Sequence, residues 1–463
     1  MESDGATDGG ETALLCSYAA QLRYEDLPTE VVRRAKDCIT DTVAAMLQGR
    51  TLPWSQLLTG YAAGSGGAGR STLFGHPGRG FDAAAAAFGN GALAHSFELD
   101  SLTYPSAGTH PGANLVPAAL AVAQEADAGG RGLITAIVAG CEVLNRVGRA
   151  CGKVDAAFHQ PGIFGPIGGA VATVHILKLD AGGFQNAVGL AASLGSGLMA
   201  FAASQDGGMV KKLHLGRAAE GGVLAGRLAA AGVNGPSAVF EGRSGVLDAY
   251  SQIPDREALC RGLGTTFETL TISLKRFAAH INAHTPMQAL LNLKAEHGFD
   301  GADIAAIEVF GSDRMVRHNG DRCPTDLMMA QYSVPFCMAL AAFRDPQDPA
   351  SFAEGSFEDP AIQRLCRRIT VAEEAPPPDL PLRTRVGVTL HDARVLEGSA
   401  DSYPGMPLQP ADTSRRQRHF LKCAGANAAT RELFERLDAL EIETRLDFIV
   451  DSYKPLHEQE QGP

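Results

Sequence analysis

Small side chains dominate the first 270 residues of this chain of 463 residues and constrain its fold more than any other feature. Ala-rich stretches of roughly 10 to 20 residues follow one another there, separated by Gly, Pro or Asp as consecutive helices are. Many of the 53 glycines lie inside these stretches, where each costs up to about 1 kcal/mol relative to Ala unless close packing compensates. We therefore expect tightly crossed helices. They should span residues 25–49, 81–97, 115–127, 133–150, 165–178, 183–203 and 215–231.

The sequence changes character after about residue 270, where short β-rich runs replace the Ala-rich stretches. The runs at 304–312, 367–374 and 384–398 predict strands, and the last contains a His-Asp turn between two of them. Charged helical patterning returns at 411–446. We expect this tail to pack back on the first helices.

The predicted fold class is therefore mainly α, with a large, discontinuous all-helical domain and a smaller α+β lid domain. A chain of this length exceeds the size at which a single core usually stops growing, so two domains are expected. The helical domain should use residues 1–268 together with the C-terminal helices in 400–463, and the α+β domain should use 269–399.

Charge and cysteine usage narrow the classes of partner. The balance of 40 basic and 52 acidic residues gives a net charge of -12, which repels nucleic acid and anionic membrane surfaces. Nine cysteines without a C-x-x-C pair suggest reduced thiols, and neither a signal peptide nor a long apolar run is evident. We expect a cytoplasmic protein with no nucleic-acid partner and no membrane association.

The common cofactor motifs are missing. Residues 64–69 fit G-x-G-x-x-G, but they follow a helical stretch and lead toward a strand, so a loop is the better interpretation. No P-loop, nucleophile elbow or H-E-x-x-H motif occurs. His280 and His284 stand four residues apart, but further metal ligands are not apparent nearby. We predict an activity without cofactor and without metal.

Two segments in the helical part combine titratable side chains with loop residues. In the first, Glu98 and Asp100 follow one helix and His110 opens the next, which gives a possible acid/base pair. Helix capping by the two carboxylates would be the structural alternative. In the second, His159 precedes a Gly-rich helix whose N-terminus could bind an anion. A lone histidine there could equally serve only the structure.

Two further segments are cationic. Lys211, Lys212 and His214 lie beside Arg217 in a run of small residues, and such a cluster can hold carboxylates, although a solvated basic face is the simpler interpretation. The second segment begins with Lys275 and Arg276 and ends with His280 and His284, near the expected domain boundary. Cations there are well placed to bind an anion between the domains, or to join the domains structurally.

Together these segments resemble the MmgE/PrpD family over about residues 12 to 450. The resemblance implies the two-domain fold above, a homodimer, a positively lined cleft, and a lyase or epimerase acting on a small polycarboxylic acid. By motif position, the family's active-site residues correspond here to His110, His159, His280, Lys211 and Lys275. The motifs that carry the resemblance are HSFELD, THPGANLVPAALA, FHQPGIFGPIGGA, KKLHLGRAAEGG, KRFAAHINAH and PTDLMMAQYSVPF.

One departure concerns the first motif, which reads H-x-x-D-F-D-D-T in many members and runs from His95 to Leu102 here. Glu98 replaces the first Asp, and a further Asp and the Thr are lost. This departure puts the exact substrate and reaction of the family in question for this chain.

The family reactions share one need, the making or breaking of a C–H bond beside a carboxylate, which calls for proton-transfer groups and for cations. We expect His110 and His159 to exchange the proton, His280 to orient or protonate, and Glu98 or Asp100 to tune a histidine. The expected carboxylate-binding residues are Lys211, Lys212, His214, Lys275 and Arg276.

Dehydration of a citrate-like or 2-methylcitrate-like hydroxy acid is the first expectation. Decarboxylation of the cis-aconitate type is second, and epimerisation of an imino- or aminodicarboxylate is third. A non-catalytic dimer that binds a ligand is the alternative from another class.

Overall fold

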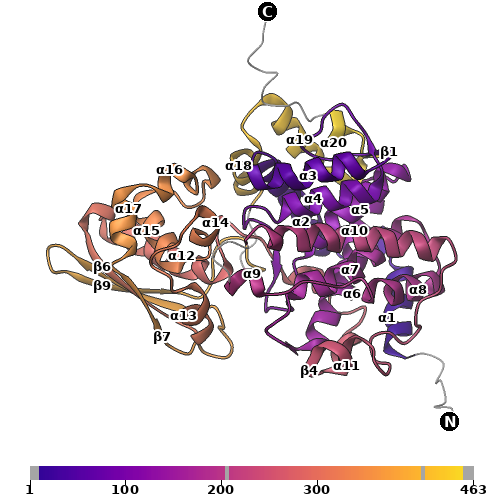
Figure 1. Ribbon diagram of the computed structural model, residues 1–463, viewed down its shortest axis with the longest axis horizontal. Coiled ribbons are helices and arrows are strands. Elements are labelled where there is room, and N and C mark those ends of the chain that lie inside the picture. Colours follow the sequence, from indigo (N-terminus) through magenta and orange to yellow (C-terminus); the bar gives the residue numbers. More distant parts are fainter. Residues whose placement is uncertain (1–9, 204–207, 408–411, 452–463) are drawn as a thin grey trace, which may run out of the picture.

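The computed structural model describes residues 10–203, 208–407 and 412–451, which form two bodies side by side (Figure 1). The larger body is helical and the smaller one combines helices with a sheet, so the predicted mainly α fold with a smaller α+β part is confirmed. No helix among the described residues is both long enough and apolar enough to span a bilayer.

The larger body consists mainly of helices joined by loops of varied length. Its helices are α1 (Glu11–Gln21), α2 (Thr29–Gly49), α3 (Pro53–Ser65), α4 (Ala83–Ala94), α5 (Pro111–Glu125), α6 (Gly130–Cys151), α7 (Gln160–Ile176), α8 (Ala181–Ala192), α9 (Ala200–Ala203), α10 (Val210–Ala230) and α11 (Val246–Tyr250). Short strands accompany them: β1 (Ala68–Ser71), β2 (Leu102–Thr103), β3 (Lys153–Val154), β4 (Ser251–Ile253) and β5 (Ile272–Ser273).

Glycines let α7 and α10 approach closely. A Cβ atom added to Gly222 of α10 would lie 2.6 Å from the carbonyl carbon of Gly169 in α7. Gly216 brings α10 equally close to α4, because its added Cβ would lie 2.6 Å from the backbone oxygen of Phe88. The close helix crossings expected from the small-residue pattern are therefore present, and they place the N-terminal half of α10 against the end of α4.

Two details of the helical prediction are wrong. The stretch 183–203 is not one helix, because α8 ends at Ala192 and a loop precedes α9. The loop is held by tertiary hydrogen bonds: the backbone N–H of Ser196 donates to Gly162 O (3.2 Å) and that of His159 to Gly197 O (3.1 Å). The region before residue 268 is also less helical than expected, since residues 232–271 form mostly turns and short helical segments.

The smaller body is built on a four-stranded sheet of order β7-β6-β8-β9. Strand β6 (Ile304–Gly311) runs parallel to β7 (Ile369–Glu373) and antiparallel to β8 (Thr384–Leu390), which forms a hairpin with β9 (Val395–Ala400). The three predicted β-rich runs and the His-Asp turn are confirmed. The accompanying helices are α12 (His284–His297), α13 (Asp313–Asn319), α14 (Leu327–Ala330), α15 (Val334–Phe343), α16 (Glu354–Phe357) and α17 (Pro360–Cys366).

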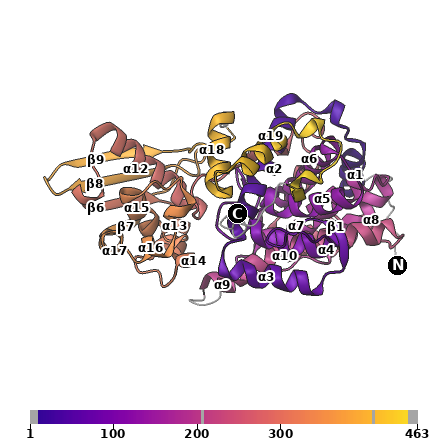
Figure 2. The same ribbon diagram turned by 90° about the horizontal axis from the view of Figure 1, so that it is seen from above.

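The C-terminal segment returns to the larger body. Its helices α18 (Thr413–Ala424) and α19 (Ala428–Asp438) pack against α2 (Figure 2), and α20 (Phe448–Asp451) follows. Arg416 of α18 forms a buried ion pair with Asp37 of α2 (2.9 Å) and a partly exposed one with Asp438 of α19 (2.8 Å). Two distant stretches of the chain therefore build the helical body. The exact domain limits at 268/269 and 399/400 stay a prediction.

Two glycine-to-alanine substitutions should have opposite effects on stability. In Gly222→Ala the new methyl group meets backbone atoms of α7, so we expect a loss of about 1–3 kcal/mol in the free energy of unfolding. The matched control is Gly60→Ala on α3, where an added Cβ meets no atom within 4 Å, and here we expect a gain of about 0.5–1 kcal/mol. Urea or thermal midpoints measure both. Equal shifts in one direction would contradict the close-packing account.

Candidate active site

Glu98 lies at the centre of a buried group of lysines. It follows α4 in the segment 95–101, whose side chains are all buried, and its backbone adopts a φ of 55°. Lys211 and Lys212 come from the first turn of α10, and Lys275 follows β5. The Nζ atom of Lys211 is paired with Oε1 of Glu98, that of Lys212 lies 3.3 Å from the same oxygen, and that of Lys275 lies 3.2 Å from Oε2.

The electrostatic balance of this group favours the ionised carboxylate of Glu98. Burial by itself would raise the pKa of the Glu98 carboxyl, but Lys211, Lys275 and Lys212 together outweigh burial and hold that pKa well below its usual range. Burial lowers the pKa of Lys212 to about 8, against the opposing influence of Glu98. Three ammonium groups thus face one carboxylate, and positive charge is in excess around it.

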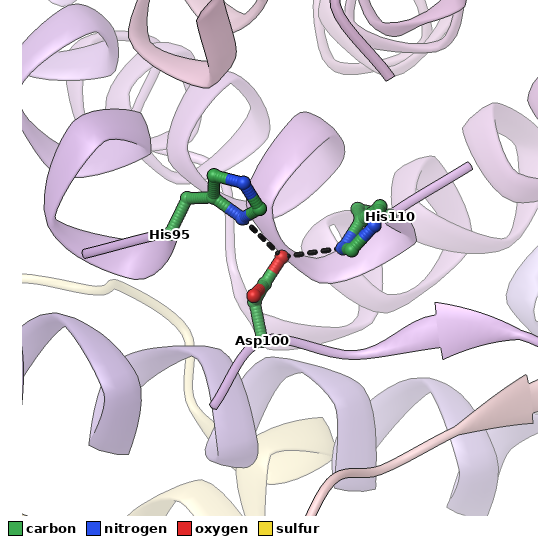
Figure 3. A group of neighbouring side chains, drawn as sticks. All are labelled: His95, Asp100 and His110. Atoms are coloured by element: carbon green, nitrogen blue, oxygen red, sulfur yellow. Dashed lines mark hydrogen bonds and ion pairs between the residues drawn. The ribbon is translucent and has the colours of Figure 1, made fainter. Parts of the chain in front are cut away.

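Asp100 holds two histidines on one oxygen (Figure 3). Its Oδ2 lies 2.7 Å from Nδ1 of His95 and 2.6 Å from Nδ1 of His110, and its Oδ1 lies 3.8 Å from Nζ of Lys275. Burial opposes ionisation of Asp100, but the two histidines and Lys275 outweigh it and hold the pKa of the carboxyl well below its usual range. Burial lowers the pKa of His95 to about 3, so this imidazole is neutral near pH 7.

The shared oxygen also fixes which ring nitrogens carry protons. An ionised carboxylate only accepts hydrogen bonds, so both Nδ1 atoms donate to Asp100 and leave the two Nε2 atoms for other partners. Nε2 of His95 is buried without a partner. His110 is the more open of the two, with 19% of its side chain exposed. His110 is therefore the better placed of the pair to exchange a proton with a bound molecule.

The same three side chains are the candidate metal ligands among the described residues, because their ligand atoms lie within 4.8 Å of one another. Two ligands of one tetrahedral zinc ion, each about 2.1 Å from it, lie about 3.4 Å apart. The nitrogen–oxygen distances of 2.6 and 2.7 Å are shorter than this and match charge-assisted hydrogen bonds. The geometry thus fits hydrogen bonding better than ligation. The absence of a metal from the activity stays a prediction.

His159 and His214 form a second pair of imidazoles beside the first. Their Nδ1 atoms lie 3.1 Å apart, and the ring of His159 lies 6.0 Å from that of His95. Burial, together with Lys211, lowers the pKa of His159 well below its usual range and also lowers that of His214. Both rings are therefore neutral near pH 7, and one Nδ1–H donates to the other Nδ1.

His280 joins the group through Tyr332, a residue of the smaller body. The two rings lie 5.0 Å apart, and Nζ of Lys211 lies 4.7 Å from the centre of the Tyr332 ring, a cation–π distance. Burial lowers the pKa of His280 well below its usual range. Burial and the neighbouring carboxylates of Glu98 and Asp100 raise the pKa of Tyr332 well above its usual range, so its hydroxyl stays protonated.

Arg276 does not join this group, contrary to the sequence-based expectation. Its Nη1 lies 3.7 Å from Oδ1 of Asp41 in α2, and Nε2 of His419 in α18 lies 3.6 Å from the same oxygen. Lys275 and Arg276 thus point to different buried groups. His284 lies apart as well, since its ring packs between Phe277 and Tyr403.

The structure brings together most of the predicted site residues and adds two. His95 and Tyr332 occur in the family motifs, but the sequence predicted no role for either. The spacing of five residues between His95 and Asp100 could have indicated that the two side chains interact. Glu98 contacts lysines directly, whereas Asp100 is the carboxylate that contacts histidines. The predicted residues that lie in this connected group are Glu98, Asp100, His110, His159, Lys211, Lys212, His214, Lys275 and His280.

Glu98→Gln should lower stability in a pH-dependent way. The pKa of Glu98 is lower in the folded than in the unfolded chain, so its stabilising charge is present above a pH of about 4.5 and is lost as pH falls through the folded pKa. Removing that charge leaves buried lysines unpaired, and we expect a loss of about 3 kcal/mol near pH 7.

Urea unfolding of the wild type and Glu98→Gln across about pH 2.5 to 8 measures this effect, with Glu432→Gln on the exposed face of α19 as the control. The gap between wild type and Glu98→Gln should narrow toward the acid end. A gap that stays constant with pH would contradict the ionised state of Glu98.

Comparison with known proteins agrees with the fold. The chain matches the MmgE/PrpD N-terminal domain over residues 13–258 and the MmgE/PrpD C-terminal domain over 277–439. It is 28% identical to a cis-aconitate decarboxylase of Aspergillus terreus over 398 residues (81% of this chain, 80% of the relative) and 26% identical to the human cis-aconitate decarboxylase over 416 residues (86% and 85%).

A further relative is a cis-aconitate decarboxylase-like protein of Aspergillus oryzae, 30% identical over 340 residues (69% of this chain, 70% of the relative). Since the two domain matches together span most of the chain, the resemblance seen in its motifs is confirmed, and this protein belongs to the MmgE/PrpD family.

Proposed function

We propose that this protein is a cofactor-independent decarboxylase of cis-aconitate or of a closely related unsaturated polycarboxylate. The observation that supports the proposal most is the convergence of Lys211, Lys212 and Lys275 on a single buried carboxylate beside paired histidines. The excess positive charge suits a substrate with several carboxylates. The relatives above, which match the chain over most of its length, bear names of this activity.

The reaction can be written with its electrons balanced. The bond between the methylene carbon of cis-aconitate and its carboxylate breaks and releases CO₂. The electron pair of that bond forms a new double bond between the methylene carbon and the central carbon. The electron pair of the old double bond shifts to the carbon that bears another carboxylate, and a proton is added there to give itaconate. The step needs cations at the remaining carboxylates, where negative charge develops, and one proton donor.

The side chains suit these needs in the following way. Lys211 and Lys275, with Lys212 and His214 beside them, would bind the carboxylates. His110 would donate the proton, because Asp100 holds its Nδ1 and leaves Nε2 for a bound molecule, and because its side chain is the more exposed of the pair. His159 and His280, which are neutral near pH 7, would orient the substrate or relay the proton.

The other reactions have less support. Dehydration of a citrate-like hydroxy acid was the first expectation from the sequence, but the relatives favour the second expectation, decarboxylation. Epimerisation has no named relative in its favour among these proteins. A non-catalytic ligand-binding role would not explain why two pairs of histidines lie beside the lysines.

The remaining expectations stay proposals: a homodimer, a cytoplasmic location, and no need for a cofactor or metal. Exposed apolar side chains on α3, among them Leu57 and Tyr61, support self-association. Light scattering during gel filtration would test the dimer.

Proton NMR in D₂O of the EDTA-treated protein with cis-aconitate tests the proposal. Two new vinyl signals should appear as itaconate forms, and deuterium should enter its saturated methylene group because the added proton comes from solvent. His159→Gln should lower kcat by about 100-fold. His297→Gln on the surface of α12 is the matched control and should retain wild-type turnover.

Citrate and 2-methylcitrate, incubated in parallel, test the alternative. Vinyl products from these hydroxy acids, with cis-aconitate left intact, would overturn the decarboxylase proposal in favour of a dehydratase. Wild-type turnover in His159→Gln would remove His159 from the mechanism.

A further inference from the structure

Two neighbouring residues of the smaller body, Gln331 and Tyr332, reach between the segments that carry the site residues. They follow α14 and belong to the stretch that matches the C-terminal family domain, whereas Glu98 and Lys211 belong to the N-terminal one. Gln331 is completely buried. Its amide nitrogen has two hydrogen-bond partners, whereas its Oε1 is buried without one.

The Gln331 side chain ties two such segments together. Its Nε2 donates one hydrogen bond to Phe97 O (3.1 Å) and another to Ala278 O (2.8 Å). Phe97 directly precedes Glu98, and Ala278 lies two residues before His280. One amide group therefore sets the distance between the loop that holds the central carboxylate and the loop that holds a site histidine.

The main chain around Gln331 adds to this connection. The backbone N–H of His280 donates to Gln331 O (2.8 Å). The amide of Asn319 donates to Tyr332 O (2.8 Å) and accepts from the amide of Asn282 (2.8 Å), two residues after His280. The turn at residues 331–332 is thus attached to the His280 loop by both side-chain and main-chain hydrogen bonds.

Tyr332 extends the contact to Lys211. Its ring packs on His280 and lies under the Lys211 ammonium group at 4.7 Å. A ring face in this position attracts the ammonium group and limits its movement. Gln331 and Tyr332 together contact the Glu98 loop and Lys211 from the other family domain, and the His280 loop from their own.

We propose that Gln331 and Tyr332 are positioning residues, which hold the Glu98 loop, Lys211 and His280 in the arrangement that the reaction requires. The consequence for kcat rests on the proposed function, but the positioning itself does not. The smaller body thereby supplies part of the site's geometry, so the reaction depends on how the two bodies are seated against each other.

Gln331→Met tests the amide, because methionine keeps the length of the side chain and removes both donors. We expect kcat for cis-aconitate to fall about 100-fold with a smaller change in KM, since the site loses alignment more than binding charge. Hydrogen exchange should become faster at the backbone amides near residues 97–100 and 278–281. The matched control is Gln363→Met, which removes a donor to Phe357 O elsewhere in the same domain and should change neither readout.

Tyr332→Leu tests the ring independently, should Gln331→Met fail to fold. We expect kcat/KM to fall about tenfold, and Tyr332→Phe, which keeps the ring, should restore most of that loss. The control is Tyr24→Leu, which removes a similar ring under Arg131 far from the site and should leave kcat/KM unchanged.

The outcomes separate this inference from the proposed function. If the wild type does not decarboxylate cis-aconitate, the proposed function fails, and faster exchange in Gln331→Met still supports the positioning role. Wild-type kcat together with wild-type exchange in Gln331→Met would overturn the inference. Equal losses in Gln331→Met and Gln363→Met would overturn it too, because the effect would then be general destabilisation.

Discussion

The arrangement of the site depends on the burial of one carboxylate, that of Glu98, among three lysines. A buried carboxylate or ammonium group alone would carry a large desolvation cost, so each of these side chains requires the others. The lysines come from the start of α10 and from the segment after β5, and Glu98 comes from the segment after α4. The ion pairs thus fix three distant segments at one point, and the excess of positive charge there gives the site its preference for anions.

Close helix packing makes this arrangement possible. Gly216 and Gly222 allow α10 to approach α4 and α7 to within backbone contact, which places Lys211 and Lys212 beside the end of α4. The loop after α8 lies against the start of α7 and receives a hydrogen bond from the backbone of His159. Two histidine pairs, His95 with His110 and His159 with His214, then lie next to the lysines. The small side chains of the sequence are therefore a structural requirement of the site.

The helices and the sheet were predictable because each follows from local patterning, such as the small-residue stretches and the hairpin around His391 and Asp392. The helix break after Ala192 was not, because tertiary hydrogen bonds stabilise it in a segment whose composition still favours a helix. The position of Arg276 was not predictable for a similar reason: tertiary ion pairs, with Asp41 for Arg276 and with Glu98 for Lys275, take two adjacent side chains to different groups. The contribution of Tyr332 depends on a cation–π contact between two domains, which spacing along the chain does not reveal.

The central claim is that the lysines around Glu98 bind the carboxylates of the substrate. Isothermal titration with tricarballylate, which keeps the three carboxylates of cis-aconitate but lacks its double bond, measures this binding without turnover. The account predicts a measurable Kd for the wild type and an affinity about tenfold or more weaker in Lys275→Met. Equal affinities in the two proteins, or no binding by the correctly folded wild type, would contradict it.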